Sequence, residues 1–368
     1  MLMIFLYAMF AVIAYIVARF EYNPIKDEDT VSFLRGGQLS IVSIVILSLF
    51  AVGINVYYTD LTSMHHMAGA RANYLNGFKN ELKAATVGLT FVFKQVKEHG
   101  GNFEDVLYLT TFISIAGSLF CYKISKISTP LGLLFCFLTP CLLNSFIVLK
   151  QTYANVFASI AIILMMREKT WKKEALILFF IWLACQFHPV AYLMVPVYFL
   201  LRFYIKEDRE YDISFILLIA IIVLASLSFL MVFIAKILTP IIPYLSSKIL
   251  EYFSGEKDQV GDAGLILMLK GAYSYYITYY LIRYRTYIQY NLGFYNQILI
   301  ISLIISACYL ISPFNYWLPR TAFLLEFPVL LYWAKSLQYV PNWYWLRNVS
   351  LFLTGFFTFR TLLLIFVF

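Results

Sequence analysis

Apolar segments long enough to cross a membrane recur along the whole sequence. Hydrophobic residues occupy 62% of the 368 positions and charged residues only 13%, whereas soluble domains carry about 25% charged residues. A hydrocarbon core about 30 Å thick is crossed by about 20 apolar helical residues. The sequence therefore predicts an all-α polytopic membrane protein with a single integral membrane domain, residues 1–368. Spans are expected near 2–20, 38–57, 103–121, 129–149, 151–166, 175–187, 189–201, 213–237, 264–282, 292–312, 319–335 and 347–367.

One of these segments is interrupted by a histidine and a proline. Residues 175–201, ALILFFIWLACQFHPVAYLMVPVYFLL, carry no formal charge, but each half of about 13 residues rises only about 20 Å. Both halves cannot cross the membrane, so Pro189 is expected to end the first helix of a broken hairpin. The total is then about 11–12 transmembrane helices. His188 would lie below the membrane surface, where irregular backbone must line a polar cavity.

The basic residues between the spans predict the orientation. They cluster in KISK (123–126), REKTWKK (167–173), residues 202–209 and residues 283–285, and such clusters mark the cytoplasmic side. Residues 58–102 and 238–263 are then extracytoplasmic loops. The short segment 82–96 is expected to be an interfacial or re-entrant helix in the first loop. The first twenty residues have no basic start and end in Arg-Phe, so they are expected to form the first span rather than a cleavable signal.

Three cationic or protonatable residues fall at separate junctions on the predicted outer side. They are Lys150, His188 and Arg320, and ionisable residues at membrane depth usually face a cavity. Each has a structural alternative. Lys150 could be an end anchor, His188 a hydrogen-bonded core histidine, and Arg320 the partner of Glu326 in an ion pair.

The loop 58–82 adds further ionisable groups, among them Asp60, Arg71 and Glu81. His65 and His66 suggest a metal, but adjacent imidazoles project in different directions and no second set of ligands follows, so no metal is expected. The five cysteines lie in or beside apolar windows and are expected to be small buried hydrophobic residues. The net charge of +8 does not indicate nucleic acid, because no soluble domain carries it.

Fixed cations beside a base, on the outer leaflet and without a metal, suit a lipid-linked diphosphate leaving group. Lysine and arginine neutralise charge on the departing diphosphate, while a carboxylate or imidazole accepts the proton of an attacking hydroxyl. Candidate diphosphate-binding residues are Lys150, Arg71 and Arg320. Candidate catalytic residues are His188, Glu81 and Asp60.

The same residues carry a resemblance to the EpsG-like family of polysaccharide polymerases, relatives of the Wzy-type O-antigen and capsule polymerases. Its elements are Lys150-Gln151 opening a helix, then REKTWKK, LACQFHPVAYLMVP, YYTDL, GNFEDVLYLT and PRTAFLLEF, in this order along most of the chain except for the earlier YYTDL and GNFEDVLYLT. The family more often has Arg where this chain has Lys150, which keeps the charge but loses the bidentate fork.

The resemblance implies a GT-C-like architecture and a multi-pass enzyme of the bacterial cytoplasmic membrane, with its active site facing the periplasm or exterior. It implies inverting transfer of an undecaprenyl-diphosphate-linked chain onto another lipid-linked repeat unit, with Gln151 and Tyr58 binding substrate and no cofactor. Implied partners are undecaprenyl-diphosphate-linked oligosaccharides, membrane lipids, a chain-length regulator and a flippase, but no nucleic acid.

Three other functions fit parts of the pattern. An O-antigen ligase would share the diphosphate-binding cations, a lipid-linked sugar flippase would carry charge through the bundle interior, and an acyltransferase would centre on His188. Two roles stay open for His188 in the polymerase. It is either the base for the acceptor hydroxyl or a protonated partner of the phosphate, and Arg could replace only the latter.

Overall fold

A computed structural model describes residues 71, 74–75, 87–127, 149–238, 260–312, 318–336 and 339–340. The secondary structure in these ranges is helical, and they contain no strand. The expected all-α class is confirmed for this part of the chain. The chain divides into two compact units, Met1–Met194 with Leu330–Phe368, and Val195–Val329.

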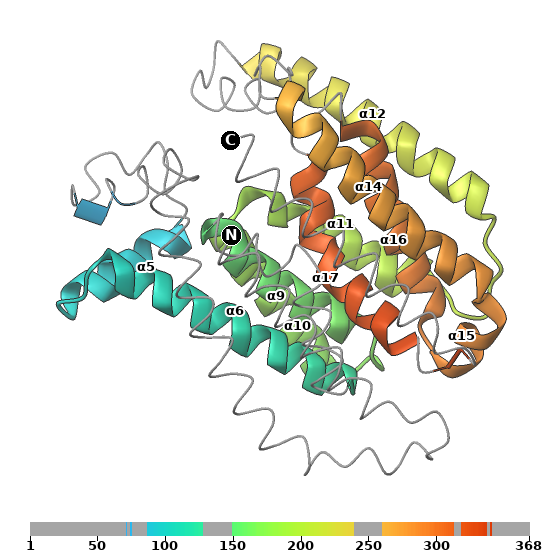
Figure 1. Cartoon of the computed structure of the whole chain (residues 1–368), viewed down its shortest axis with the longest axis horizontal. Helices are drawn as coiled ribbons and strands as arrows, with labels where there is room; N and C mark the ends of the chain where they lie inside the picture. The colour runs from blue at the N-terminus through green and yellow to red at the C-terminus, as the bar shows by residue number, and fades with distance from the viewer. Residues whose placement is uncertain are drawn as a thin grey trace, which may run out of the picture. The chain divides into compact units, whose positions relative to one another are not determined.

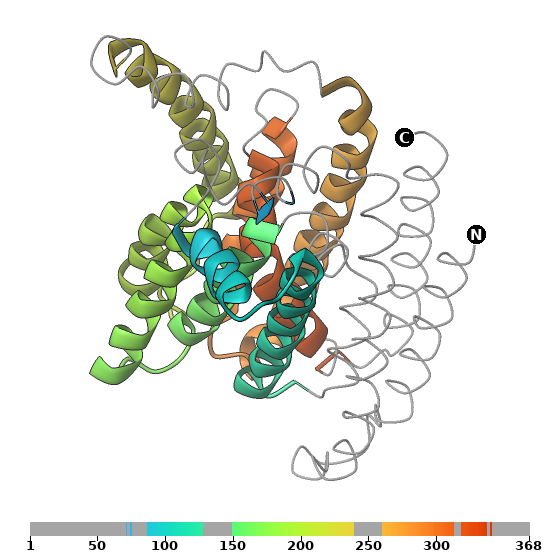
Figure 2. The same cartoon turned by 90° about the vertical axis from the view of Figure 1, so that its left-hand side faces the viewer.

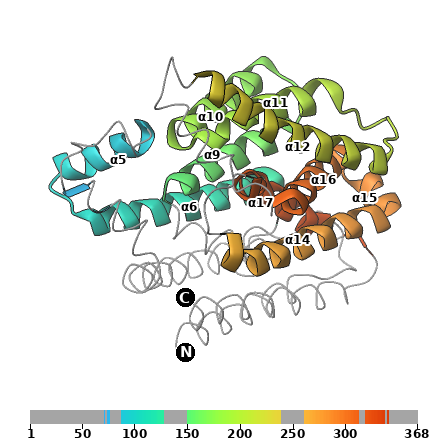
Figure 3. The same ribbon diagram turned by 90° about the horizontal axis from the view of Figure 1, so that it is seen from above.

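The first unit is built around a central helix with a neighbour on each side. Its described elements are α5 (Val87–Glu98), α6 (Phe103–Ser125), α9 (Leu149–Met165), α10 (Trp171–Phe187) and the short 3₁₀ helix η2 (Pro189–Leu193). Helix α9 packs against both α6 and α10 (Figures 1 and 3). It is largely buried, as expected for a helix that is apolar on most of its faces.

Helices α5 and α6 form a hairpin whose turn is defined by the sequence (Figure 2). Gly100 has a φ of 75°, a left-handed conformation that glycine adopts without a Cβ penalty. Asn102 then caps α6, accepting the N–H of Asp105 at 3.1 Å, while the Asp105 carboxylate accepts the N–H of Asn102 at 2.7 Å. The interfacial helix expected at 82–96 corresponds to α5, and its first five predicted residues lie outside the described ranges.

The second unit contains α11 (Met194–Phe199), a π-helical turn η3 (Leu200–Tyr204), α12 (Ile213–Leu238), α14 (Val260–Arg283), α15 (Arg285–Asn291) and α16 (Tyr295–Ile311). Helix α16 lies between α12 and α14 (Figure 3). Small hydroxyl residues join α14 to α16: Thr278 Oγ1 lies 2.6 Å from Ser302 Oγ. Such residues let two helices approach closely and satisfy each other's polar groups in an apolar setting.

The final described helix, α17 (Leu318–Ser336), contributes residues to both units. Within the described ranges, α6 is the one helix long and apolar enough to cross a membrane by those criteria. Its 23 residues rise about 35 Å. Four shorter apolar stretches accompany it: Leu149–Met165, Pro189–Tyr204, Ile213–Ser226 and Tyr295–Ile311.

The total of 11–12 spans therefore stays a prediction. The expected spans 2–20, 38–57 and 347–367 lie outside the described residues, as does 129–149 apart from its last residue. Two boundaries differ from expectation. Helix α14 begins at Val260, inside the predicted loop 238–263, and α10 begins at Trp171 rather than 175. The Thr170 hydroxyl explains the second difference, because it accepts the N–H of Lys173 and caps α10.

Candidate functional site

The described start of α9 and the end of α10 lie together in the first unit. The Tyr153 ring stacks on the Phe187 ring, with centroids 4.6 Å apart and an interplanar angle of 9°. Tyr153 follows Lys150 and Gln151 by less than one turn, and Phe187 directly precedes His188. The fold thus brings three sequence-predicted residues to one end of the α9–α10 pair. Gln151 is 3% exposed and His188 is 8% exposed.

The helix break expected at His188–Pro189 is confirmed. Helix α10 ends at Phe187, and His188 has extended backbone angles, φ −149° and ψ 131°. The imidazole Nδ1 of His188 then accepts the N–H of Val190 at 3.2 Å. Pro189 occupies the first position of η2, where a missing N–H has little cost. The segment after the break contacts both α9 and α10.

Helix α5 covers the Phe187 side of this site. A Cβ built on Gly88 would lie 2.9 Å from three atoms of the Phe187 ring, so only glycine fits there without a shift. The ring also lies 5.7 Å from the ring of Phe157 on α9. The residue before His188 is therefore enclosed by α5 and α9, which restricts where the histidine can move.

Helix α6 supports the same end through a buried hydrogen bond. The Thr110 hydroxyl donates to the Val106 carbonyl at 2.7 Å and lies 3.0 Å from the Tyr153 hydroxyl. Because the Thr110 proton is used on Val106, Tyr153 is the donor to Thr110. The sequence analysis did not select Tyr153. Its position in the turn after Lys150-Gln151 was the available signal, but its partners on α6 and α10 were not visible in the sequence.

The opposite end of these helices carries the basic loops. The Lys335 ammonium donates to the Ser125 carbonyl at 3.1 Å, at the end of α6, and Lys126 caps that helix with a φ of 54°. Arg167 and the start of α10 follow the end of α9. The 17 residues of α9 separate these groups from Lys150 by about 25 Å. This separation agrees with the predicted cytoplasmic and outer sides.

Arg71 lies beside the start of α6. Its guanidinium is 3.3 Å from the Glu104 carboxylate, and both side chains are about half exposed, at 52% and 46%. An exposed pair of this kind contributes about 0–1 kcal/mol. The pairing therefore leaves phosphate binding by Arg71 energetically open.

Arg320 belongs to the second unit, at the start of α17. Its convergence with Lys150 stays a prediction. Because α17 is a continuous helix, Arg320 and Glu326 are six residues apart and do not share a helix face. Glu326 is 2% exposed.

Several predicted residues lie outside the described ranges: Asp60, Glu81, Tyr58, His65 and His66. Within the ranges that are described, no group of three or more His, Cys, Asp or Glu residues is arranged to hold a metal ion.

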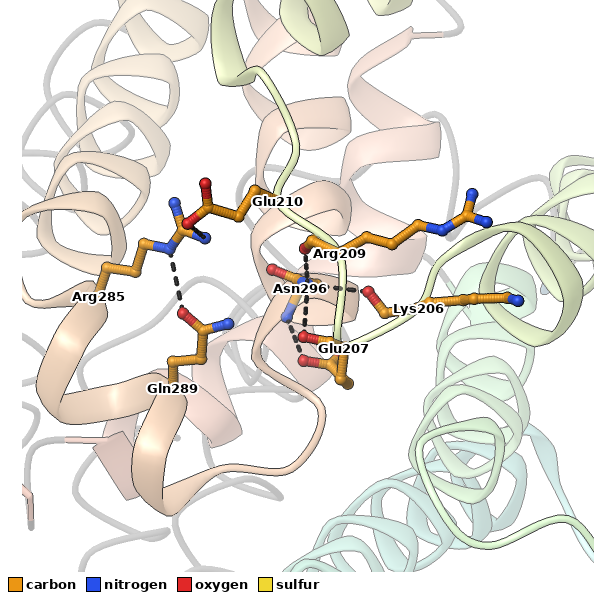
Figure 4. A network of polar contacts seen from close by, with 7 residues as sticks. All are labelled: Lys206, Glu207, Arg209, Glu210, Arg285, Gln289 and Asn296. Carbon is orange, nitrogen blue, oxygen red and sulfur yellow. Dashed lines mark hydrogen bonds and ion pairs between the residues drawn. The ribbon is translucent and has the colours of Figure 1, made fainter.

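A polar network in the second unit joins two predicted cytoplasmic segments (Figure 4). The Glu207 carboxylate accepts the N–H groups of Asn296 and Gln297 at 2.9 and 3.2 Å, at the N-terminus of α16. The Asn296 amide donates to the carbonyls of Lys206 and Arg209, both at 2.9 Å. A carboxylate at this place satisfies helix N–H groups that have no partner within the helix.

Burial nevertheless raises the pKa of the Glu207 carboxyl, and the N–H groups that it accepts only partly offset the rise. Arg285 adds a link from α15, with its guanidinium 3.4 Å from Glu210. The basic loop after η3 and the segment after α14 therefore lie on one side of the second unit, as the positive-inside pattern predicts.

The described part of the molecule is an all-helical protein of apolar helices, with its basic residues gathered at helix ends and a polar junction at Lys150 and His188. The family model of the EpsG family matches residues 39–368, and the chain belongs to that family. Membership associates the protein with the membrane and with exopolysaccharide biosynthesis. Searches of curated proteins and of solved structures gave no match.

Proposed function

We propose that this protein polymerises undecaprenyl-diphosphate-linked oligosaccharide repeat units at the outer face of the cytoplasmic membrane. The observation that carries the proposal is the meeting of Lys150 and Gln151 with His188 at one helix end, opposite the basic loops. Membership in a family associated with exopolysaccharide biosynthesis supports the substrate class. A cation and an imidazole at an outer junction suit a diphosphate better than a neutral sugar alone.

The proposed step is an inverting glycosyl transfer. A hydroxyl oxygen at the non-reducing end of one lipid-linked unit attacks the anomeric carbon of the donor chain. The bond between that carbon and the diphosphate oxygen breaks, and undecaprenyl diphosphate leaves with the electron pair. The hydroxyl proton passes to a carboxylate, for which Glu81 and Asp60 are the candidates.

The cations stabilise the charge that develops on the leaving group. Lys150, Arg71 and Arg320 are proposed to contact the diphosphate, and Gln151 and Tyr58 the sugars. Burial of Lys150 then costs less, because the anion compensates its charge. The proposal uses no metal and no cofactor, and a chain-length regulator and a flippase are the expected partners.

The test is polymerisation by the purified protein with lipid-linked repeat units as the only substrate. A ladder of products that differ by one repeat unit is expected, and EDTA should not reduce it. Lys150→Ala and Arg320→Ala should lower the rate about 100-fold or more, the effect of removing one charge-stabilising group. Lys172→Ala, an exposed lysine at the other end of α10, is the matched control and should leave the rate unchanged.

Other outcomes identify other functions. Transfer to a lipid A core without any ladder would identify a ligase. Movement of the lipid-linked sugar across vesicle membranes without bond formation would identify a flippase. Restoration of an EDTA-treated enzyme by a divalent cation would overturn the metal-free step.

A further inference from the structure

The hydrogen bond made by His188 fixes which nitrogen of its ring carries the proton. Nδ1 accepts the backbone N–H of Val190 at 3.2 Å, and this contact caps η2. An acceptor nitrogen cannot also bear a hydrogen, so the proton of the neutral ring is on Nε2. The tautomer follows from the local backbone, because Nδ1 is the ring nitrogen that lies next to the N–H two residues ahead.

This tautomer excludes both roles that the sequence left open. A general base at Nε2 requires that nitrogen to be unprotonated, which would move the proton to Nδ1, against the Val190 N–H. An imidazolium requires protons on both nitrogens, and it too would set two donors against each other. Either form loses the cap, and the loss of a capping bond costs about 1 kcal/mol.

We propose that His188 acts as a neutral hydrogen-bond donor, with its Nε2–H directed to an oxygen of the substrate diphosphate. The inference rests on the proposed function for the identity of that anion. Lys150 supplies the charge, and His188 supplies an oriented dipole beside it. The proton of the acceptor hydroxyl then goes to a carboxylate and not to His188.

The packing around the preceding residue makes the ring position reproducible. Phe187 is stacked on Tyr153 and contacts Gly88 of α5, and the His188 side chain is nearly buried. Pro189 fixes φ of the next residue and so the approach of the Val190 N–H to Nδ1. A donor held by such a scaffold loses little freedom when substrate binds.

A pair of amide substitutions separates the two nitrogens of His188. The Asn side-chain amide reaches about as far as Nδ1, and the Gln amide about as far as Nε2. His188→Asn should keep the cap but lower the polymerisation rate as much as His188→Ala does, about 100-fold. His188→Gln should lose the cap yet keep a rate within about tenfold of wild type, because removal of a cap costs only about 1 kcal/mol. Normal amounts of folded protein in the membrane are the control for each variant.

Two results would overturn the inference. A His188→Asn rate near that of wild type would limit the histidine to capping. A His188→Arg rate well above that of His188→Gln would show that charge is required.

A second measurement does not depend on activity. Nitrogen-15 NMR of the histidine-labelled full-length protein, with the His188 signal assigned by its loss in His188→Gln, should show a protonated Nε2 and an unprotonated Nδ1 at neutral pH. The reverse pattern, or two protonated nitrogens, would refute the donor role. Absence of a ladder with the wild-type protein would instead refute the proposed function, and the NMR result would still decide the tautomer.

Discussion

Gly88→Ala is the substitution that most directly tests how α5 supports the candidate site. The added methyl group would meet the Phe187 ring at 2.9 Å, closer than carbon atoms approach without a shift. The ring cannot retreat freely, because Tyr153 is stacked on it at 4.6 Å. Either α5 moves away or Phe187 leaves its stack, and His188 is the next residue along the chain.

Two opposing terms set the expected change in stability. In an uncrowded helix, Gly to Ala stabilises by about 0.5–1 kcal/mol. Overpacking of a filled contact costs about 1–3 kcal/mol. We therefore expect a net loss of about 0.5–2 kcal/mol in the free energy of unfolding. The polymerisation rate should fall further, because a displacement of about 1 Å at a reacting site can cost about 100-fold.

The assays are thermal unfolding of the detergent-solubilised protein and the rate of ladder formation. Val87→Ala is the control, because Val87 is 72% exposed and adds no clash. Adding Phe187→Leu to Gly88→Ala should recover part of the stability, so that the two changes are not additive. If Gly88→Ala is more stable than wild type and equally active, α5 does not press on Phe187 and the reasoning fails.

Three further predictions concern the loops. Asn296→Ala should lower the free energy of unfolding by about 1–3 kcal/mol, since buried carbonyls after η3 lose their donor, whereas Asn291→Ala removes one exposed bond and should have little effect in the same thermal assay. The raised pKa of Glu207 means that its contribution to stability is complete below the ordinary value of 4.5 and is lost as the pH rises through the folded-state value, so Glu207→Gln should remove this slope from a plot of melting temperature against pH, and an unchanged slope would contradict the assignment. Cysteines placed at Gly255 and Lys172 should react from opposite sides of the membrane, Gly255 with an impermeant reagent added to intact cells, and equal labelling from one side would reverse the predicted orientation.

Much of the local structure could be predicted from the sequence. The apolar period and the basic loops predicted the described helices to within a few residues, including the break at His188–Pro189, because proline and charge act through the adjacent backbone and solvent. Start positions were less accurate where a cap decided them, as Thr170 does for α10. The contacts of Gly88 and Tyr153 were not predictable, since their partners lie on other helices.

The sequence by itself determined the helical class, the positions of the basic clusters and the candidate groups Lys150, Gln151 and His188, because composition, helix length and local breaks depend on neighbouring residues. Only the tertiary structure decided that Lys150 and His188 share one helix end and that Phe187 is enclosed between α5 and α9. The same is true of Glu207, which caps the start of α16 from a loop about 90 residues earlier. Such contacts depend on which helix faces meet, and many arrangements of apolar helices bury similar area while only one brings these polar groups together.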